Sequence, residues 1–129
     1  MHLSFETTMT KLNLSELGGN KELLQCARYG ELDDLNLLIQ AGASIDYIEP
    51  YGGSTSLHYA AANGHIDCVK SLIKAGASII ENISGNTALH WSAQNKHFEI
   101  FKYFCTAKEC TKNVNVLATN KDGKSALTL

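Results

Sequence analysis

The sequence predicts an all-α solenoid, a row of stacked helix pairs that share one hydrophobic core. The first observation is an internal repeat, because Thr55–His65 returns thirty-two residues later as Thr87–His97. The second is an apolar stripe at offsets 0, 3, 6 and 7, which lies on one side of a helix and recurs in every unit. Units of this period bury their apolar faces only against their neighbours. The stripe residues are Leu32, Leu35, Leu38 and Ile39, then Ile66, Val69, Leu72 and Ile73, then Phe98, Phe101, Phe104 and Cys105.

The array is expected over residues 20–129. Residues 1–19 match no repeat, and we expect them to form an N-terminal capping segment because an array needs a cover for its first apolar face. The last repeat stops after its first helical turn, so we hypothesise that these 129 residues are a fragment of a longer protein. A natural stop codon after Leu129 would contradict that idea. The predicted repeats are approximately 20–50, 51–82 and 83–119, with a truncated fourth at 120–129.

Glycines mark the predicted turns. In the first repeat, helices over 21–29 and 32–41 are each ended by a glycine, which readily adopts the left-handed conformation past a helix end. The third repeat has Lys96 and Lys108 at the equivalent places. A lysine in the left-handed region costs about 1–2 kcal/mol, so this repeat either tolerates strain or turns differently. Residues 106–113 are also longer than the equivalent segment, which predicts a bulged loop.

The repeated motifs resemble the ankyrin repeat. The helix start Thr55-Ser56-Leu57-His58 is similar to the family's Thr-Pro-Leu-His, and the turn Asn63-Gly64-His65 is identical to its Asn-Gly-His. The segment Leu72–Ile79 is similar to the family's second-helix ending, and the resemblance covers Lys21 to Leu129. It implies an ankyrin-repeat solenoid of antiparallel helix pairs, with three full repeats and the start of a fourth. It also implies hairpin fingers at 47–53, 81–85 and 118–123.

The threonines and histidines of the motif have a structural interpretation. Thr55, Thr87 and Ser125 lie at predicted helix starts, where a hydroxyl accepts a hydrogen bond from an orphan backbone N–H for about 1 kcal/mol. In the ankyrin family the following histidine, here His58 or His90, bonds nearby turn groups and ties adjacent units together. We expect that role rather than a chemical one.

Composition is that of an ordinary water-soluble domain. The chain is 44% hydrophobic and 19% charged, with a net charge of −2. Residues 1–67 carry nine acidic and three basic side chains (−6), whereas residues 68–129 carry four acidic and eight basic ones (+4). No secretory signal or membrane-spanning run is recognisable. We therefore expect a cytoplasmic or nuclear protein, a monomer without membrane contact.

No catalytic, cofactor-binding or metal site is predicted. The sequence has no nucleophile elbow, no phosphate-binding glycine loop and no close Cys or His pairs of the kind that bind zinc. We expect Cys26 and Cys68 to be small buried hydrophobes. The alternative that Cys105 and Cys110 pair or react stays open.

The remaining function is recognition of a partner protein on the concave face that ankyrin fingers and first helices form. The alternative is a recruiting or regulatory accessory domain of an enzyme whose catalytic part lies beyond Leu129. Nucleic acid is not expected as a partner, because the net charge is negative and no recognisable binding module is present. Tyr59 and Trp91 are expected to pack inside the stack. The family's contact positions fall here on Arg28, Tyr29, Tyr51, Gly52, Ser54, Ala62, Asn63, Ile83, Ser84, Asn86, Gln94, Asn95, Lys121, Asp122 and Lys124.

Overall fold

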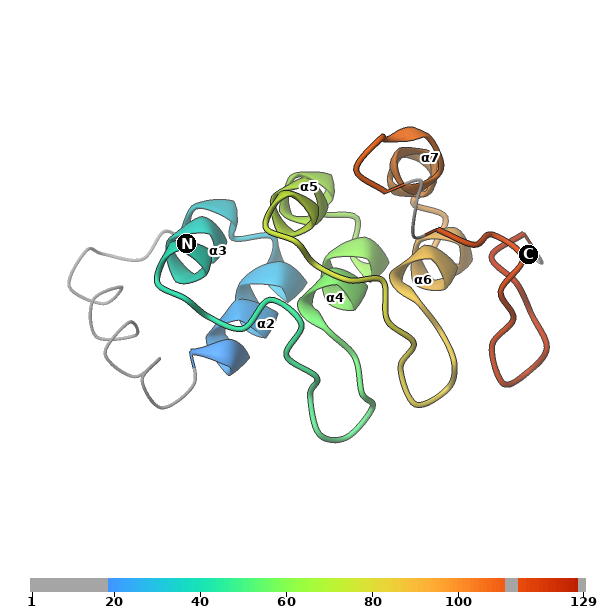
Figure 1. The fold of residues 1–129 in the computed structure, drawn as a ribbon, viewed down its shortest axis with the longest axis horizontal. Coiled ribbons are helices and arrows are strands. Elements are labelled where there is room, and N and C mark those ends of the chain that lie inside the picture. Colours follow the sequence, from blue (N-terminus) through green and yellow to red (C-terminus); the bar gives the residue numbers. More distant parts are fainter. Residues whose placement is uncertain (1–18, 111–113, 128–129) are drawn as a thin grey trace.

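The computed structural model describes residues 19–110 and 114–127, so residues 1–18 of the predicted capping segment lie outside the described residues. Within the described ranges the chain forms helices and no strand, and the helices come in three pairs. Each pair is followed by a projecting loop (Figure 1). The helices are α2 (Asn20–Tyr29), α3 (Leu32–Gln40), α4 (Ser56–Ala62), α5 (Ile66–Lys74), α6 (Ala88–Gln94) and α7 (Phe98–Thr106).

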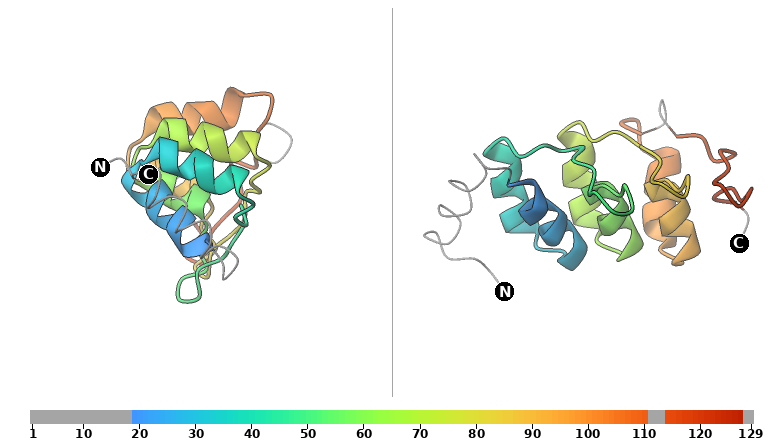
Figure 2. Two further views of the ribbon diagram at one scale, coloured as in Figure 1. Left: turned by 90° about the vertical axis from the view of Figure 1, so that its left-hand side faces the viewer. Right: turned by 90° about the horizontal axis from the view of Figure 1, so that it is seen from below.

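The helix pairs stack in a row, which confirms the predicted all-α solenoid. Helices α2, α4 and α6 form an inner row, and α3, α5 and α7 form an outer row (Figure 1). Contacts run along each row, between α2 and α4, α4 and α6, α3 and α5, and α5 and α7. The views along and below the stack show the fingers projecting to one side of the helices (Figure 2). The fingers and the inner row therefore share one face, which we call the concave face.

The core follows the predicted stripe in the first two repeats. Leu35 and Leu38 in α3, and Val69 and Leu72 in α5, are fully or almost fully buried between neighbouring helices. Burying a side chain of this size contributes about 1.5–3 kcal/mol, so these positions hold the repeats together.

The prediction for the third repeat was wrong at Phe98. This side chain is 56% exposed, whereas Ile100 and Phe104 of the same helix are buried. Phe98 lies at the end of the described array, where it lines a small hollow with Phe101 and Leu127. No helix follows α7 within residues 114–127 to cover Phe98, whereas its counterparts Leu32 and Ile66 are partly buried against the core.

The two unusual lysines behave differently. Lys96 keeps the left-handed conformation of its glycine counterparts, with φ of 62°, so this turn tolerates the strain. After α7 the chain leaves through Ala107 in an extended conformation, with φ of −72° and ψ of 135°. Lys108 is not among the left-handed residues, so this turn differs from the glycine turns. In the loop that follows, residues 111–113 lie outside the described part of the chain.

Candidate functional site

The fingers that form the concave face are held by side chains acting as local acceptors. In the second finger, Asn82 Oδ1 accepts from the backbone N–H groups of Ser84 and Asn86, both at 3.0 Å. In the third, Asn120 Oδ1 accepts from Asp122 at 2.9 Å and Lys124 at 3.0 Å. Such side-chain caps replace the backbone partners that a tight turn lacks.

Glu49 takes this role in the first finger. Its carboxylate accepts from the backbone N–H groups of Tyr51 at 3.0 Å, of Gly52, and of Ser54 at 3.4 Å. Slight burial acts to raise the pKa of Glu49, but these backbone donors outweigh it and the pKa falls below 4.5. The ionised carboxylate therefore organises the finger.

Successive fingers also bond to one another. The Ile83 N–H donates to the Gly52 carbonyl at 2.9 Å, and the Lys121 N–H donates to the Ser84 carbonyl at 3.0 Å. The amide of Asn120 donates to Asn86 Oδ1 at 2.8 Å. The fingers are therefore a connected row, and each fingertip has a fixed position relative to the next.

Buried histidines tie the inner helices to this row. The Thr55 N–H donates to His58 Nδ1 at 3.1 Å, and the Thr55 side chain accepts from the His58 N–H, which completes a capping box. Since Nδ1 is an acceptor, Nε2 carries the proton and donates to the Asn86 carbonyl at 2.7 Å in the next repeat. Burial lowers the pKa of His58 below 6.5. The hydrogen bond to Asn86 acts to raise this pKa, and the neighbouring His90 lowers it further.

His90 repeats the arrangement one unit later. Its Nδ1 accepts from the Thr87 N–H at 3.1 Å, and its Nε2 lies 3.0 Å from the Ala118 carbonyl and 3.2 Å from that of Lys124. The expected role of both histidines as ties between units is confirmed. Ser125 differs because no helix follows it among the described residues, although its Oγ accepts from the Leu127 N–H at 3.3 Å.

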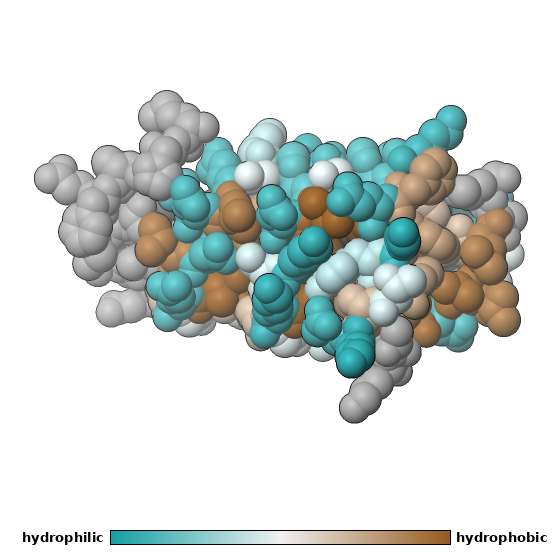
Figure 3. Space-filling model, turned by 90° about the horizontal axis from the view of Figure 1, so that it is seen from above, coloured by the Kyte–Doolittle hydropathy of each residue, from teal (hydrophilic) through white to brown (hydrophobic). Residues whose placement is uncertain are grey.

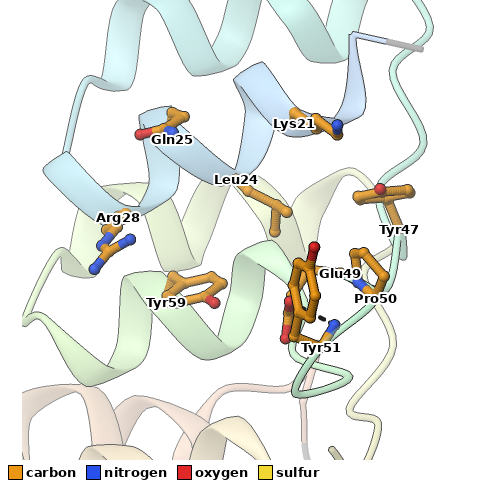
Figure 4. A pocket seen from close by; sticks show the side chains of 9 residues that line it. All are labelled: Lys21, Leu24, Gln25, Arg28, Tyr47, Glu49, Pro50, Tyr51 and Tyr59. Atoms are coloured by element: carbon orange, nitrogen blue, oxygen red, sulfur yellow. Dashed lines mark hydrogen bonds between the residues drawn. The ribbon is translucent and has the colours of Figure 1, made fainter.

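A first hollow on the concave face lies between α2, the first finger and α4 (Figure 4). It encloses about 260 Å³. Three of its nine lining residues are tyrosines, Tyr47 and Tyr51 from the finger and Tyr59 from α4, so we call it the aromatic hollow. The Arg28 guanidinium lies 5.7 Å from the centre of the Tyr59 ring and 5.8 Å from that of Tyr29. The other lining residues are Lys21, Leu24, Gln25, Glu49 and Pro50.

The second hollow lies between α6, the start of α7 and the last two fingers, and encloses about 450 Å³. Its wall is mainly polar. The amide of Gln94 donates to Asn86 Oδ1 at 3.3 Å across part of it. The lining residues are Asn86, Ala93, Gln94, Lys96, Phe98, Asn120, Asp122 and Lys124.

The predicted contact residues divide between these hollows and the surface around them. Arg28 and Tyr51 line the first hollow, and Asn86, Gln94, Asp122 and Lys124 line the second. A third group is exposed but lines neither, namely Tyr29, Asn63, Ile83, Ser84, Asn95 and Lys121.

Ser54 requires a correction. Its side chain is only 2% exposed, and its hydroxyl accepts from the Asn82 amide at 3.4 Å. Ser54 therefore supports the finger from inside and presents no side chain at the surface. Asn63 and Asn95 are exposed, but their amides donate to the carbonyls of Arg28 and Trp91.

Sequence reasoning missed the inner face of α2. Lys21, Leu24 and Gln25 line the first hollow together with Arg28, at helix offsets 0, 3, 4 and 7. This spacing places all four on one side of α2 and was readable from the sequence. Tyr59 was expected inside the stack, and it is half-buried with its ring edge-on to Trp91 at 6.2 Å.

The outer face contrasts with these hollows. Hydrophilic and hydrophobic side chains alternate over α3 and α5, and hydrophobic ones gather toward the C-terminal end (Figure 3). The aromatic hollow lies on the other side, over the inner row. Among the described residues, no group of three or more His, Cys, Asp and Glu side chains is placed to hold a metal ion.

The cysteines are all free thiols. Cys26 and Cys68 are buried as predicted, and burial raises the pKa of Cys68 to about 11, with a further contribution from Asp67. Cys110 is also buried, and Cys105 is half-buried in α7. No helix in the described ranges is long and apolar enough to span a lipid bilayer.

Comparison with known proteins agrees with this geometry. No curated protein matches the chain. The family model for ankyrin repeats matches residues 23–120 as three copies, which is most of the chain. These copies include the Thr-x-x-His caps, the left-handed turns and the stacked fingers described above. The chain therefore belongs to the ankyrin repeat family, whose repeats are generally protein–protein interaction modules.

Proposed function

We propose that the chain is an interaction module that binds a partner protein on its concave face. Ankyrin repeat domains are typically non-catalytic, which favours recognition over chemistry. The observation that carries the proposal is the exposure of large side chains at the fingertips. Tyr51 is 91% exposed and Ile83 is 63% exposed, and both are on fingers whose backbones are hydrogen-bonded to one another.

Rigidity supports this assignment. Binding is weakened when loops must be ordered first, and the bonds from Ile83 to Gly52 and from Lys121 to Ser84 remove much of that freedom in advance. A large aromatic side chain such as Tyr51 also contributes strongly when a partner desolvates it. A partner can therefore meet a preformed surface.

The test compares capture of a partner by matched variants. Tyr51→Ala and Ile83→Asp should each reduce the amount of partner recovered from the source cells by about tenfold or more, since central anchors are worth about 2 kcal/mol. Leu37→Ala is the control, because Leu37 is a partly exposed apolar residue of the outer helix α3. All three should melt close to the wild-type temperature. Undiminished recovery with both fingertip variants would refute the concave-face assignment.

A further inference from the structure

The basic side chains of the first half of the array are gathered in its aromatic hollow. Between residues 19 and 67 the chain has two lysine or arginine residues, Lys21 and Arg28, and both line this hollow. Of the seven acidic residues in the same range, Glu49 alone lines it. The remaining six, Glu22, Glu31, Asp33, Asp34, Asp46 and Asp67, do not.

The charges inside the hollow do not cancel one another. The Glu49 carboxylate is engaged by three backbone N–H groups of its own finger. Within the part of the chain that the structure describes, no carboxylate forms an ion pair with Lys21 or Arg28. The Arg28 guanidinium lies over aromatic rings, an arrangement that leaves the N–H groups at its edge available to a ligand. The hollow therefore favours an anionic ligand.

The spacing of the two cations indicates which backbone conformation of a peptide ligand could reach both of them. Lys21 and Arg28 are two helical turns apart on one side of α2, which separates them by about 10.5 Å along the axis. In a polyproline II segment, residues i and i+3 are on the same side and about 9 Å apart. In a β-strand these two residues point to opposite faces. Flexible side chains cover the small difference, so the polyproline II form matches both distance and direction.

The wall between the cations suits the rest of such a segment. Figure 4 shows Leu24 between Lys21 at one end of α2 and Arg28 at the other, with the Tyr51 ring on the first finger across the hollow. Aromatic-lined grooves accept proline-rich polyproline II peptides, because the rings pack on the flat faces of prolines and the ligand loses little entropy.

We propose that this hollow binds an acidic, proline-rich segment of the partner in the polyproline II conformation. Its carboxylates at positions i and i+3 bond Lys21 and Arg28, and the intervening residues pack on Leu24 and Tyr51. This inference rests on the proposed function, because it names the partner chemistry that one part of the concave face recognises.

The test is fluorescence anisotropy with labelled synthetic proline peptides and the full chain. A peptide with two glutamates three residues apart should bind saturably and more weakly as salt is added. An isomer with adjacent glutamates should bind at least about threefold more weakly, because its carboxylates cannot reach both cations. Lys21→Gln and Arg28→Gln should each weaken binding about three- to tenfold. Lys102→Gln, on the outer helix α7, should have no effect.

Several outcomes would overturn the inference. These are no binding of the spaced peptide, equal binding of its isomer, or preference for a single-stranded oligonucleotide of equal charge. Because Arg28 also contacts Tyr59, melting temperatures are measured for each variant, and Lys21→Gln provides a change with no intramolecular partner among the described residues. If the peptides fail while Tyr51→Ala and Ile83→Asp still reduce partner recovery, this inference falls and the proposed function stands.

Discussion

The stability of Gly64→Ala tests how closely two repeats approach each other at the inter-helix turn. Gly64 has φ of 80°, and a Cβ there would lie 2.8 Å from His97 Cε1 and 2.9 Å from Nδ1 in the next repeat. The left-handed backbone costs alanine about 1–2 kcal/mol, and displacing a packed ring adds about 1–3 kcal/mol. The expected loss of unfolding free energy is therefore about 2–5 kcal/mol. Gly76→Ala is the matched control, because φ is 96° there and no atom lies within 4 Å of the added Cβ.

Urea denaturation followed by Trp91 fluorescence suits this comparison. The Trp91 ring contacts His58 and Tyr59 of the preceding repeat edge-on, at 5.3 and 6.2 Å between ring centres, so it reports on the interface between the two repeats. Gly64→Ala should be less stable than Gly76→Ala by about 1–3 kcal/mol, and His97→Ala should remove that difference. Equal losses for the two glycine variants would show that backbone strain, and not contact between repeats, explains the glycine.

Three further predictions concern the caps, a histidine and a thiol. Thr87→Ala should destabilise the fold by about 1 kcal/mol in chemical denaturation, because it removes the acceptor of the His90 N–H, whereas Thr87→Ser should not. The pKa of His58 is lowered, so the unfolded chain binds a proton there before the folded chain does. The free energy of unfolding should therefore fall as pH drops below about 6.5. The fall should be smaller in His58→Gln. If stability depends on pH equally steeply in this variant, His58 is not a buried neutral histidine. A disulfide reagent should modify Cys105 in the native protein well before Cys68, which is buried and has a pKa of about 11. Equal rates would contradict the burial of Cys68.

The features that the sequence predicted correctly are determined within one repeat or between neighbouring repeats that share the same motif. Thr55 and His58 are three residues apart, and their capping bonds need only that spacing. The left-handed glycines, such as Gly64, follow from local backbone geometry. The tie from His58 to Asn86 was available because the motif repeats, so the next unit presents the same carbonyl.

The features that it did not predict depend on what lies beyond a residue's own repeat. Phe98 has the same place in its stripe as Ile66, yet it is exposed because no later helix covers it within the described residues. Ser54 has a surface position in the family, but the second finger folds against it here. The turns at Lys96 and Lys108 also differ, because Lys96 keeps the left-handed conformation whereas the chain leaves α7 through an extended Ala107.

In the first finger, one residue, Glu49, closes the turn and also carries the negative charge. Its backbone closes from Glu49 N–H to the Ser54 carbonyl, one residue farther than the closures from Asn82 to Asn86 and from Asn120 to Lys124. The longer turn presents an additional N–H group, and a carboxylate with two oxygens on a longer side chain reaches three donors where each asparagine oxygen reaches two. Tyr51 lies within this longer turn and donates its N–H to Glu49, and the same carboxylate is the negative charge in the hollow that Lys21 and Arg28 line. A change at Glu49 must therefore alter the position of Tyr51 and the charge balance of the hollow together.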